Sequence, residues 1–197
     1  MKPLLLFAHG AGAPSSSSWM RAWANRLQSV ADVVTFDYPY MRERRRAPDP
    51  LPRLIEAHRA ALHEARRERN GSVLLAGKSM GGRVGCHVAL EEAVDGVICF
   101  GYPLRARGKS GKLRDAVLLD LRSPVLFVQG SRDALCPLET LQAVRDKMQA
   151  KNELYVVEGG DHSLLVTKTE LARSGRAQSD IDRGALDEVV RFVRSLQ

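Results

Sequence analysis

The chain has 197 residues, 44% of them hydrophobic, which fits one globular domain over residues 1–197 with a core of its own. No apolar run approaches the roughly 20 residues that a membrane-spanning helix needs, so we exclude an integral membrane protein and expect no membrane partner. The three cysteines are too few, and odd in number, for a disulfide framework, and they favour a reducing, cytoplasmic location.

The formal net charge is +7, and much of it lies in two arginine-rich runs, residues 42–46 and 66–69. Such runs are compatible with nucleic-acid binding. Here glutamates interrupt both runs, no aromatic side chains alternate with the arginines, and no nucleic-acid-binding motif is present. We therefore interpret the runs as a solvated loop and a solvated helix face, and expect no nucleic-acid partner.

The first predicted element is an apolar strand at residues 3–8. With Lys2 before it and the small residues 11–13 after it, this segment superficially resembles a signal peptide. Its apolar core is at or below the short end of such a peptide, and its basic region is one lysine. We therefore interpret it as part of the mature protein, followed by a glycine-rich turn at residues 9–13.

Strand-like apolar runs then alternate with amphipathic helical stretches to the end of the chain. This alternation is typical of a mostly parallel sheet of about six strands with helices on both faces, and we find neither an internal repeat nor a linker. We therefore predict a single α/β domain, in which Cys86 and Cys99 are small core residues. The predicted strands are 3–8, 32–36, 72–76, 96–100, 125–129 and 154–157, and the predicted helices are 18–30, 51–70, 80–92, 138–150 and 181–196.

The most informative stretch is G-K-S-M-G at residues 77–81, between the third predicted strand and the helix at 80–92. A G-x-S-x-G in this setting is the nucleophile elbow of an α/β-hydrolase. Its serine, Ser79, occupies a sharp turn that lifts Oγ off the sheet, and the glycines avoid collisions with neighbouring strands. The plain alternative is an ordinary turn before a helix, because this motif also arises by chance.

A serine nucleophile needs a histidine as its base. A glycine-rich turn, an exposed-looking helix and the interior of the elbow helix account for four of the five histidines, namely His9, His58, His63 and His87. The fifth is His162, in a turn directly after the last strand. This is the chain position at which the fold carries its histidine.

The base in turn needs a carboxylate to orient it. Asp133 ends the turn after the strand at 125–129, and the order Ser79, Asp133, His162 matches the Ser…Asp…His order of the fold. Because Asp133 and His162 each follow a strand, both can reach the carboxyl edge of a parallel sheet. The alternatives are that Asp133 only caps a turn and that Asp161 is a turn residue beside the base. We predict a Ser79–His162–Asp133 triad.

An oxyanion hole needs two backbone N–H donors. We predict that Met80, the residue after the nucleophile, supplies one, and that Ala11, after the first strand, supplies the other, with Gly12 as the alternative. Small residues in this loop allow the backbone to approach a substrate closely. We expect His9 to brace the loop, near the substrate, rather than to transfer protons. No Cys/His cluster has metal-ligand spacing, and we expect neither a metal nor a cofactor.

Short motifs along the chain together resemble a known family. The motifs are H-G-A-G at 9–12, F-D-Y-P-Y-M at 36–41 with P-D at 48–49, G-K-S-M-G-G-R at 77–83, G-Y-P-L at 101–104, Q-G-S-R-D at 129–133 and G-D-H at 160–162. The chain resembles the small predicted hydrolases of the α/β-hydrolase fold, in the KANL/TEX-like branch related to dienelactone hydrolases. The resemblance covers nearly the whole chain and implies a minimal, lidless fold with the triad at Ser79, Asp133 and His162.

The resemblance implies no particular substrate. A dienelactone hydrolase proper would have a cysteine nucleophile, so the serine argues against that activity. Similar sequences often have a histidine where this chain has Arg105, so we expect the substrate contacts near Tyr102 and Arg105 to differ.

The predicted function is a cytoplasmic serine hydrolase that acts on a small ester or thioester through an acyl-enzyme intermediate, as a monomer or a weak homodimer. Some eukaryotic relatives serve as parts of protein complexes. The alternative is therefore a protein-interaction module on a hydrolase scaffold, with little or no catalytic activity.

The segment at residues 101–123 stands where such folds insert a lid, but it is too short for a helical cap. We predict that it overhangs the site. Because no cap is present to bury a long acyl chain, we expect short-acyl esters to outperform long ones. Its cations outnumber Asp115 and Asp120, which favours an anionic substrate, although the charges can also serve only to keep a loop soluble. These cations are Arg105, Arg107, Lys109, Lys112, Arg114 and Arg122.

Overall fold

Six parallel strands form one sheet in the computed structural model, which describes residues 2–67, 69, 71–106 and 112–197. The strand order is β2-β1-β3-β4-β5-β6, and all neighbours pair in parallel. The middle strands are buried apolar runs, as expected for a sheet that is covered on both faces. The strands are β1 (Leu4–Ala8), β2 (Asp32–Phe36), β3 (Val73–Lys78), β4 (Gly96–Phe100), β5 (Val125–Gly130) and β6 (Asn152–Val157).

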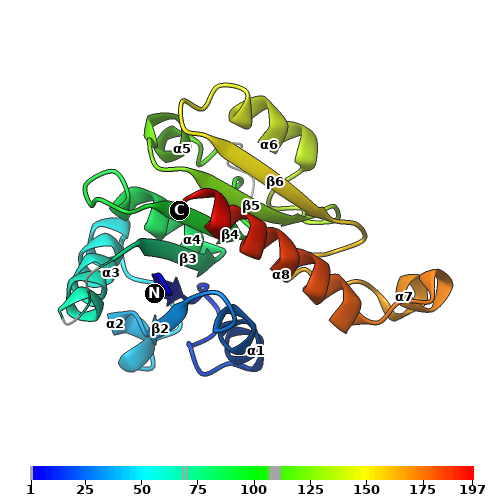
Figure 1. The fold of residues 1–197 in the computed structure, drawn as a ribbon, viewed down its shortest axis with the longest axis horizontal. Coiled ribbons are helices and arrows are strands. Elements are labelled where there is room, and N and C mark those ends of the chain that lie inside the picture. The colour runs from blue at the N-terminus through cyan, green and yellow to red at the C-terminus, as the bar shows by residue number, and fades with distance from the viewer. Residues whose placement is uncertain (1, 68, 70, 107–111) are drawn as a thin grey trace.

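Helices cover both faces of this sheet (Figure 1). One face packs against α1 and α8, and the other against α3, α4, α5 and α6. The short helices α2 and α7 lie in the connections that follow β2 and β6. The helices are α1 (Ser18–Leu27), α2 (Pro39–Arg42), α3 (Leu51–Arg66), α4 (Met80–Val88), α5 (Ala116–Asp120), α6 (Leu138–Arg145), α7 (Lys168–Ser174) and α8 (Gln178–Ser195).

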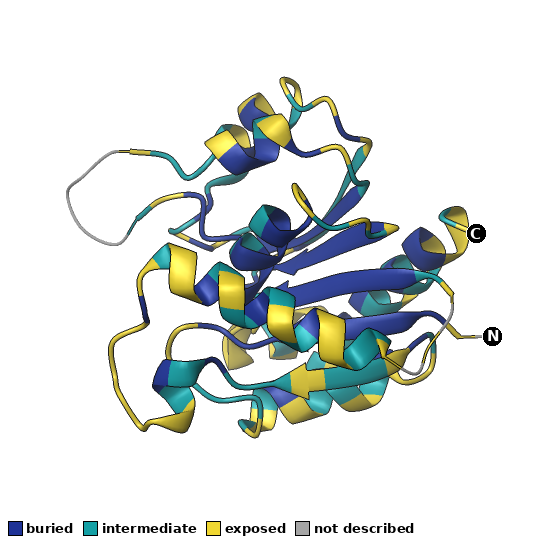
Figure 2. Cartoon of the chain, turned by 90° about the vertical axis from the view of Figure 1, so that its left-hand side faces the viewer, coloured by how far each residue is buried: buried dark blue, intermediate teal, exposed yellow. Residues whose placement is uncertain are grey.

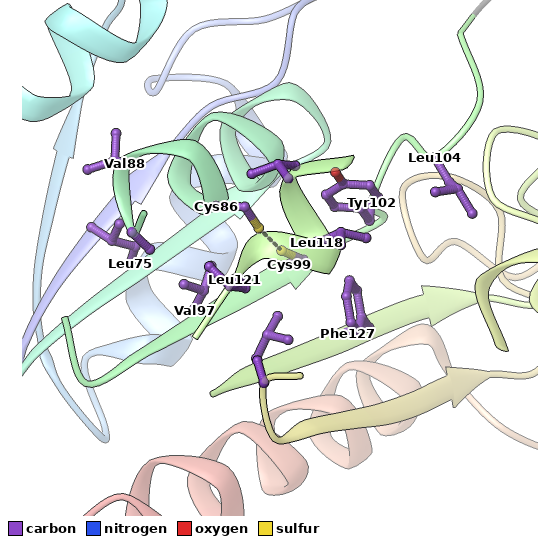
Figure 3. Close-up of a cluster of buried hydrophobic side chains, with 14 of the residues drawn as sticks. Leu75, Cys86, Val88, Val97, Cys99, Tyr102, Leu104, Leu118, Leu121 and Phe127 are labelled. Atoms are coloured by element: carbon purple, nitrogen blue, oxygen red, sulfur yellow. Dashed lines mark hydrogen bonds between the residues drawn. The ribbon is translucent and has the colours of Figure 1, made fainter. Parts of the chain in front are cut away.

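The hydrophobic core lies in two layers, one on each side of the sheet. The four middle strands are buried along their length and the edge strands β2 and β6 only in part, while buried and exposed residues alternate along the helices (Figure 2). The layer under α4 contains Cys86 and Cys99, both fully buried, with their sulfur atoms 3.7 Å apart next to Tyr102 and Phe127 (Figure 3). The prediction that these two cysteines are core residues is confirmed.

The order of the strands in the sheet reverses once, beside β1. The chain runs from β1 outward to β2, and then returns to place β3 on the other side of β1. The carboxyl ends of β1 and β3 therefore border the point at which the strand order reverses, which is where parallel sheets bind ligands. The elbow stretch 77–81 and the turn at 9–13 both begin at this point.

The predicted fold is confirmed, with differences in the helices. Each predicted strand is present within two residues of its predicted bounds, but most helices end earlier than predicted, α4 at Val88 instead of residue 92. The last residues of the predicted helix 51–70 include positions 68 and 70, which lie outside the described residues. The helices α2, α5 and α7 were not predicted, because segments of four to seven residues carry too little periodicity to stand out.

One helical face was wrongly predicted. We expected His58 to lie on an exposed helix, but its side chain is fully buried. The cause is the packing of α4 on this face of α3, where a Cβ at Gly85 would lie 3.6 Å from the His58 ring, together with Tyr38, whose hydroxyl lies 3.0 Å from His58 Nδ1. His63, one turn and a half further along, has an exposed side chain, as expected.

Candidate active site

Ser79 stands between β3 and α4 with a backbone conformation that is rare for a residue with a side chain. Its φ is +51° and its ψ is −114°, and its N–H donates to the Phe100 carbonyl at 2.9 Å. Gly81 makes this sharp turn possible, because a Cβ at that position would collide with the Ala8 carbonyl group. The turn lifts the Ser79 side chain to the carboxyl edge of the sheet and starts α4 directly behind it.

Three side chains from three different connections meet at this edge. Ser79 Oγ lies 2.8 Å from His162 Nε2, and His162 Nδ1 lies 2.7 Å from Asp133 Oδ2. A carboxylate can only accept a hydrogen bond, so His162 Nδ1 carries the proton and Nε2 accepts from the Ser79 hydroxyl. The three residues singled out from chain order thus form one continuous chain of hydrogen bonds.

Asp133 is buried and held by more than the histidine. Its Oδ1 accepts from the Leu135 N–H at 2.9 Å, and its Oδ2 accepts from Gln129 Nε2 at 2.6 Å. Burial alone would raise the pKa of this carboxyl, but the hydrogen bonds and the charge interaction with His162 outweigh it and lower the pKa. Asp133 is therefore a fixed carboxylate that faces His162.

Asp161, the other carboxylate near the histidine in sequence, has a different position. Its Oδ1 accepts from the backbone N–H groups of Ser163 and Leu165, at 2.7 and 3.0 Å. Asp161 therefore organises the turn that carries His162. Gly101 completes the fit, because its φ is +62° and a Cβ there would lie 2.6 Å from the His162 carbonyl oxygen.

Lys78, the residue before the serine, secures the same turn and was not predicted. Its ammonium group donates to Ser163 Oγ at 2.8 Å and to the His162 carbonyl at 3.3 Å, and it lies 4.3 Å from the centre of the Trp19 ring. Trp19 in turn donates from Nε1 to the Ser163 carbonyl at 2.8 Å. Burial lowers the pKa of Lys78 to about 8, against the opposing charges of Asp161 and Asp133.

The turn after β1 lies across from Ser79, and His9 and Tyr40 hold its backbone. His9 Nε2 accepts from the Tyr38 N–H at 3.1 Å, so its Nδ1 carries the proton and donates to the Gly10 carbonyl at 2.7 Å. The Tyr40 hydroxyl donates to the Ala11 carbonyl at 3.1 Å. Burial lowers the pKa of His9, in keeping with a neutral bracing ring.

The hydrogen bond from His9 to the Gly10 carbonyl also bears on one of the predicted oxyanion donors, the Ala11 N–H. The Gly10 carbonyl and the Ala11 N–H belong to the same trans peptide and point in opposite directions, so the N–H points away from the His9 ring. Met80 is the first residue of α4, and the first N–H groups of a helix have no acceptor within it. The assignment of the Ala11 and Met80 N–H groups as oxyanion donors, with Gly12 as the alternative to Ala11, stays a prediction.

A cavity of about 780 Å³ opens beside Ser79, within the usual size range of small-molecule sites. Ser79, Met80 and His162 line it together with residues 10–13 and Arg105. A second cavity, of about 730 Å³, lies at the opposite edge of the sheet, beside the end of α3 and the start of β3. Ser79, Asp133 and His162 do not line this second cavity.

Two residues that we expected near the substrate lie behind the cavity wall. His9 is fully buried beneath its turn. Tyr102 is fully buried too, because its N–H donates to Gln129 and its hydroxyl donates to the Arg114 carbonyl at 2.7 Å. Of the expected substrate contacts, Arg105 lines the cavity, while Arg107 and Lys109 lie outside the described residues.

The described residues contain neither a metal-ligand group nor a membrane-spanning helix. Across residues 2–67, 69, 71–106 and 112–197, no three His, Cys, Asp or Glu side chains come together as a metal-ligand group. In the same part of the chain no helix is both long enough and apolar enough to cross a membrane.

Comparison with known proteins places the chain in a family. A sequence model described as an alpha/beta hydrolase domain matches residues 1–194. Protein sumv-2 of Caenorhabditis elegans is 28% identical over 105 residues, which are 53% of this chain and 9% of that protein. The matched region is thus a small part of a much longer relative.

Solved structures share the fold at low sequence identity. A serine hydrolase homologue from Coxiella burnetii has a TM-score of 0.71 at 20% identity, covering 99% of this chain and 85% of that one. A dienelactone hydrolase from Anabaena variabilis has a TM-score of 0.69 at 19% identity, covering 94% and 84%. A structure from a study of two metagenome-derived lipolytic enzymes, LipS and LipT, has a TM-score of 0.71 at 16% identity, covering 98% and 94%.

Proposed function

The chain belongs to the α/β-hydrolase family, and on this premise we propose that it is a cytoplasmic serine hydrolase of small esters or thioesters. The observation that carries the proposal is the hydrogen-bonded chain from Ser79 Oγ through His162 to Asp133, with distances of 2.8 and 2.7 Å. A nucleophile, a base and an orienting carboxylate at these distances are the arrangement that acyl transfer uses. The three cysteines are free thiols, which supports a reducing compartment.

In the first half of the proposed reaction, His162 Nε2 takes the proton of the Ser79 hydroxyl as Oγ attacks the acyl carbon. Asp133 holds the imidazole in the required tautomer and stabilises the imidazolium that forms. The Met80 and Ala11 N–H groups stabilise the negative oxygen of the tetrahedral intermediate. The intermediate then collapses, and the departing alcohol or thiol takes the proton from His162.

In the second half, water releases the acyl group from Ser79 by the same route. His162 accepts a proton from the water as the water attacks the acyl carbon, and returns it to Ser79 Oγ when the ester bond to the enzyme breaks. The carboxylic acid is the second product. The scheme uses only side chains and backbone groups of this chain.

Replacing Ser79 by alanine tests the proposal. We expect Ser79→Ala to lower kcat/KM for p-nitrophenyl acetate by several orders of magnitude, because the nucleophile is removed, and to leave the circular dichroism spectrum unchanged. Ser29→Ala, an exposed serine remote from the cavity, is the matched control and keeps wild-type activity. A fluorophosphonate probe should label the wild type and Ser29→Ala, but not Ser79→Ala.

The alternative, a protein-interaction module on this scaffold, predicts a different result. In that case neither wild type nor control would hydrolyse esters or react with the probe. Wild-type turnover in Ser79→Ala would equally contradict the assignment of the nucleophile. His162→Ala should be as damaging as Ser79→Ala, and the double variant should lose little more, because the two residues act as a unit.

A further inference from the structure

The cavity beside Ser79 has a cationic lining. Among the described residues that form it, Asp49 is the one carboxylate, and its Oδ1 and Oδ2 already accept from Arg45 at 2.6 Å and from the Tyr40 N–H at 3.1 Å. The cations of the lining are Arg46, Lys78, Arg83, Arg105 and Arg114. Lys78 is committed to the turn that carries His162. The arginines of the lining therefore give the cavity its positive charge.

Arg83 differs from the exposed arginines of the lining. It is half-buried on α4, its N–H donates to the Ser79 carbonyl at 3.1 Å, and both residues line the cavity. Its Nε is fully buried and has no hydrogen-bond partner within the described part of the chain. A buried N–H without a partner is costly, and native proteins rarely keep one unless a ligand or water binds it.

Arg114 lines the same cavity as Arg83 and is held by its backbone. The Arg114 N–H donates to the Leu104 carbonyl at 2.8 Å, and the Arg114 carbonyl accepts from the Tyr102 hydroxyl. Burial, and then repulsion from Arg114, lower the pKa of Arg83. No carboxylate of the described residues pairs with Arg83, and the sequence Arg-Gly-Lys-Ser-Gly at 107–111 contains none.

Keeping a cavity loop soluble does not explain this pair. Solvation is served by exposed cations, such as Arg105, whereas Arg83 gives up hydration to lie in the wall. Two like charges in a partly enclosed space repel each other until an anion joins them. Guanidinium groups bind carboxylates and phosphates strongly, through charge-assisted and often bidentate hydrogen bonds.

We infer that Arg83 and Arg114 form an anion subsite of this cavity, and that the substrate is a small ester or thioester carrying a carboxylate or phosphate a few bonds from the scissile carbonyl. This inference rests on the proposed function and names its substrate class. Arg83 and Ser79 line the same cavity, so an anionic group bound at Arg83 shares that space with the reaction site. A helical turn spans about 5.4 Å, and the spacing suits a compact, bifunctional substrate rather than a long chain.

Matched pairs of esters test the subsite, one for each half of the substrate. 3-Acetoxybenzoate and 3-acetoxybenzamide differ by a charge on the leaving group. Monoethyl glutarate and ethyl glutaramate differ by the same charge on the acyl group. The ratio of kcat/KM, charged over neutral, is measured for each pair at low ionic strength. The wild type should prefer the charged member of at least one pair, and the pair that shows the preference identifies which half binds the arginines.

The variants Arg83→Gln and Arg114→Gln should lower that ratio, roughly 10- to 100-fold for Arg83, because one charged hydrogen-bonding partner is lost. Arg83→Lys keeps the charge without the planar fork and should retain part of the preference. Arg122→Gln is the matched control, since Arg122 lies in the same segment, binds Gln149 and does not line the cavity. It should keep the wild-type ratio.

A binding measurement separates this inference from the proposed function. Calorimetric titration of 3-acetoxybenzoate and of glutarate into Ser79→Ala requires no turnover, and Ser79→Ala/Arg83→Gln should bind the preferred anion roughly 10- to 100-fold more weakly. Equal binding by the two variants, or a charged-to-neutral ratio near one in both pairs, would overturn the anion subsite while Ser79-dependent hydrolysis of the neutral esters stands. Anion binding that depends on Arg83 without any hydrolysis would retain the subsite and refute the proposed function.

Discussion

At the scale of single residues, the site depends on a strained serine. The Ser79 conformation, φ +51° and ψ −114°, is one that side-chain-bearing residues rarely adopt, and such outliers cost about 1–3 kcal/mol each. Its hydrogen bond to the Phe100 carbonyl and the absence of a side chain at Gly81 hold the conformation in place. The consequence of the strained turn is that Ser79 Oγ lies 2.8 Å from His162 Nε2.

The roles of Asp133 and Asp161 give a prediction at the same scale. Asp133→Asn should leave His162 in place but favour the wrong tautomer, and thus lower kcat by up to about 10⁴-fold. Asp161→Asn keeps an Oδ1 acceptor for the Ser163 and Leu165 N–H groups, so it should lower kcat less than tenfold. Steady-state kinetics with p-nitrophenyl acetate compare the two variants directly.

One result would contradict the roles assigned to Asp133 and Asp161. If Asp161→Asn abolishes turnover while Asp133→Asn is nearly silent, the orienting carboxylate has been wrongly assigned. Circular dichroism and thermal unfolding of both variants establish that the losses are not losses of fold.

How far the sequence predicts the site depends on the range of each contact. Ser79, Asp133 and His162 could be named in advance because each follows a predicted strand in a recognisable order. Gln129, which joins the Tyr102 N–H to Asp133, belongs to one of the motifs that resemble the family, but no role was predicted for it. The same is true of Arg83. Their roles arise from neighbours distant in the chain, and no local pattern records such neighbours.

At the scale of elements, the strands are predicted more accurately than the helices. A buried strand is a continuous apolar run between breakers, whereas the amphipathic pattern of a helix continues into the turn that ends it, as beyond Leu27 in α1 and Arg145 in α6. The short helices depend on contacts that periodicity does not record, such as the cap of α7, where the Thr167 side chain accepts from the Glu170 N–H. The chain around α2, for instance, is held by Asp49, which accepts from the Tyr40 N–H and pairs with Arg45.

The burial of His58 on α3 predicts that acid lowers the stability of the folded protein. Burial lowers the pKa of His58 from 6.5 to about 3, and its Nε2 has no partner among the described residues. Between these values the unfolded chain binds a proton that the folded protein does not. The free energy of unfolding therefore falls as the pH falls from about 6.5 toward 3, by up to about 1.4 kcal/mol per pH unit from this group.

Urea unfolding at pH 7, 6, 5 and 4 tests this. His58→Gln keeps an acceptor for the Tyr38 hydroxyl but cannot take up the proton, so its stability should decline less steeply below pH 6.5 than that of the wild type. His63→Gln is the matched control, since it removes an exposed imidazole from the same helix, and should keep the wild-type slope. Equal slopes for all three proteins would show that His58 is not the linked group.

At the scale of the whole molecule, the fold brings four connections to one edge of one sheet. The chain after β1 supplies the Ala11 turn, the chain after β3 supplies Ser79, and those after β5 and β6 supply Asp133 and His162. Between β4 and β5, the described residues form a short helix, α5, where larger relatives of such folds would place a cap. The cavity is therefore bounded by loops and helix ends, and its apolar wall, which includes Trp19, Leu54 and Leu135, extends no further than the cavity itself.

This architecture predicts a preference for short acyl chains. Each methylene that enters the cavity of about 780 Å³ gains about 0.8 kcal/mol, roughly fourfold in kcat/KM, but methylenes beyond the wall stay in water and gain nothing. Across p-nitrophenyl acetate, butyrate, hexanoate and decanoate, kcat/KM should rise over the first members and then level off or fall. Assays below the critical micelle concentration exclude an aggregation effect. A continued rise to decanoate would mean that an apolar surface outside this cavity receives the chain, and would contradict a lidless site for small substrates.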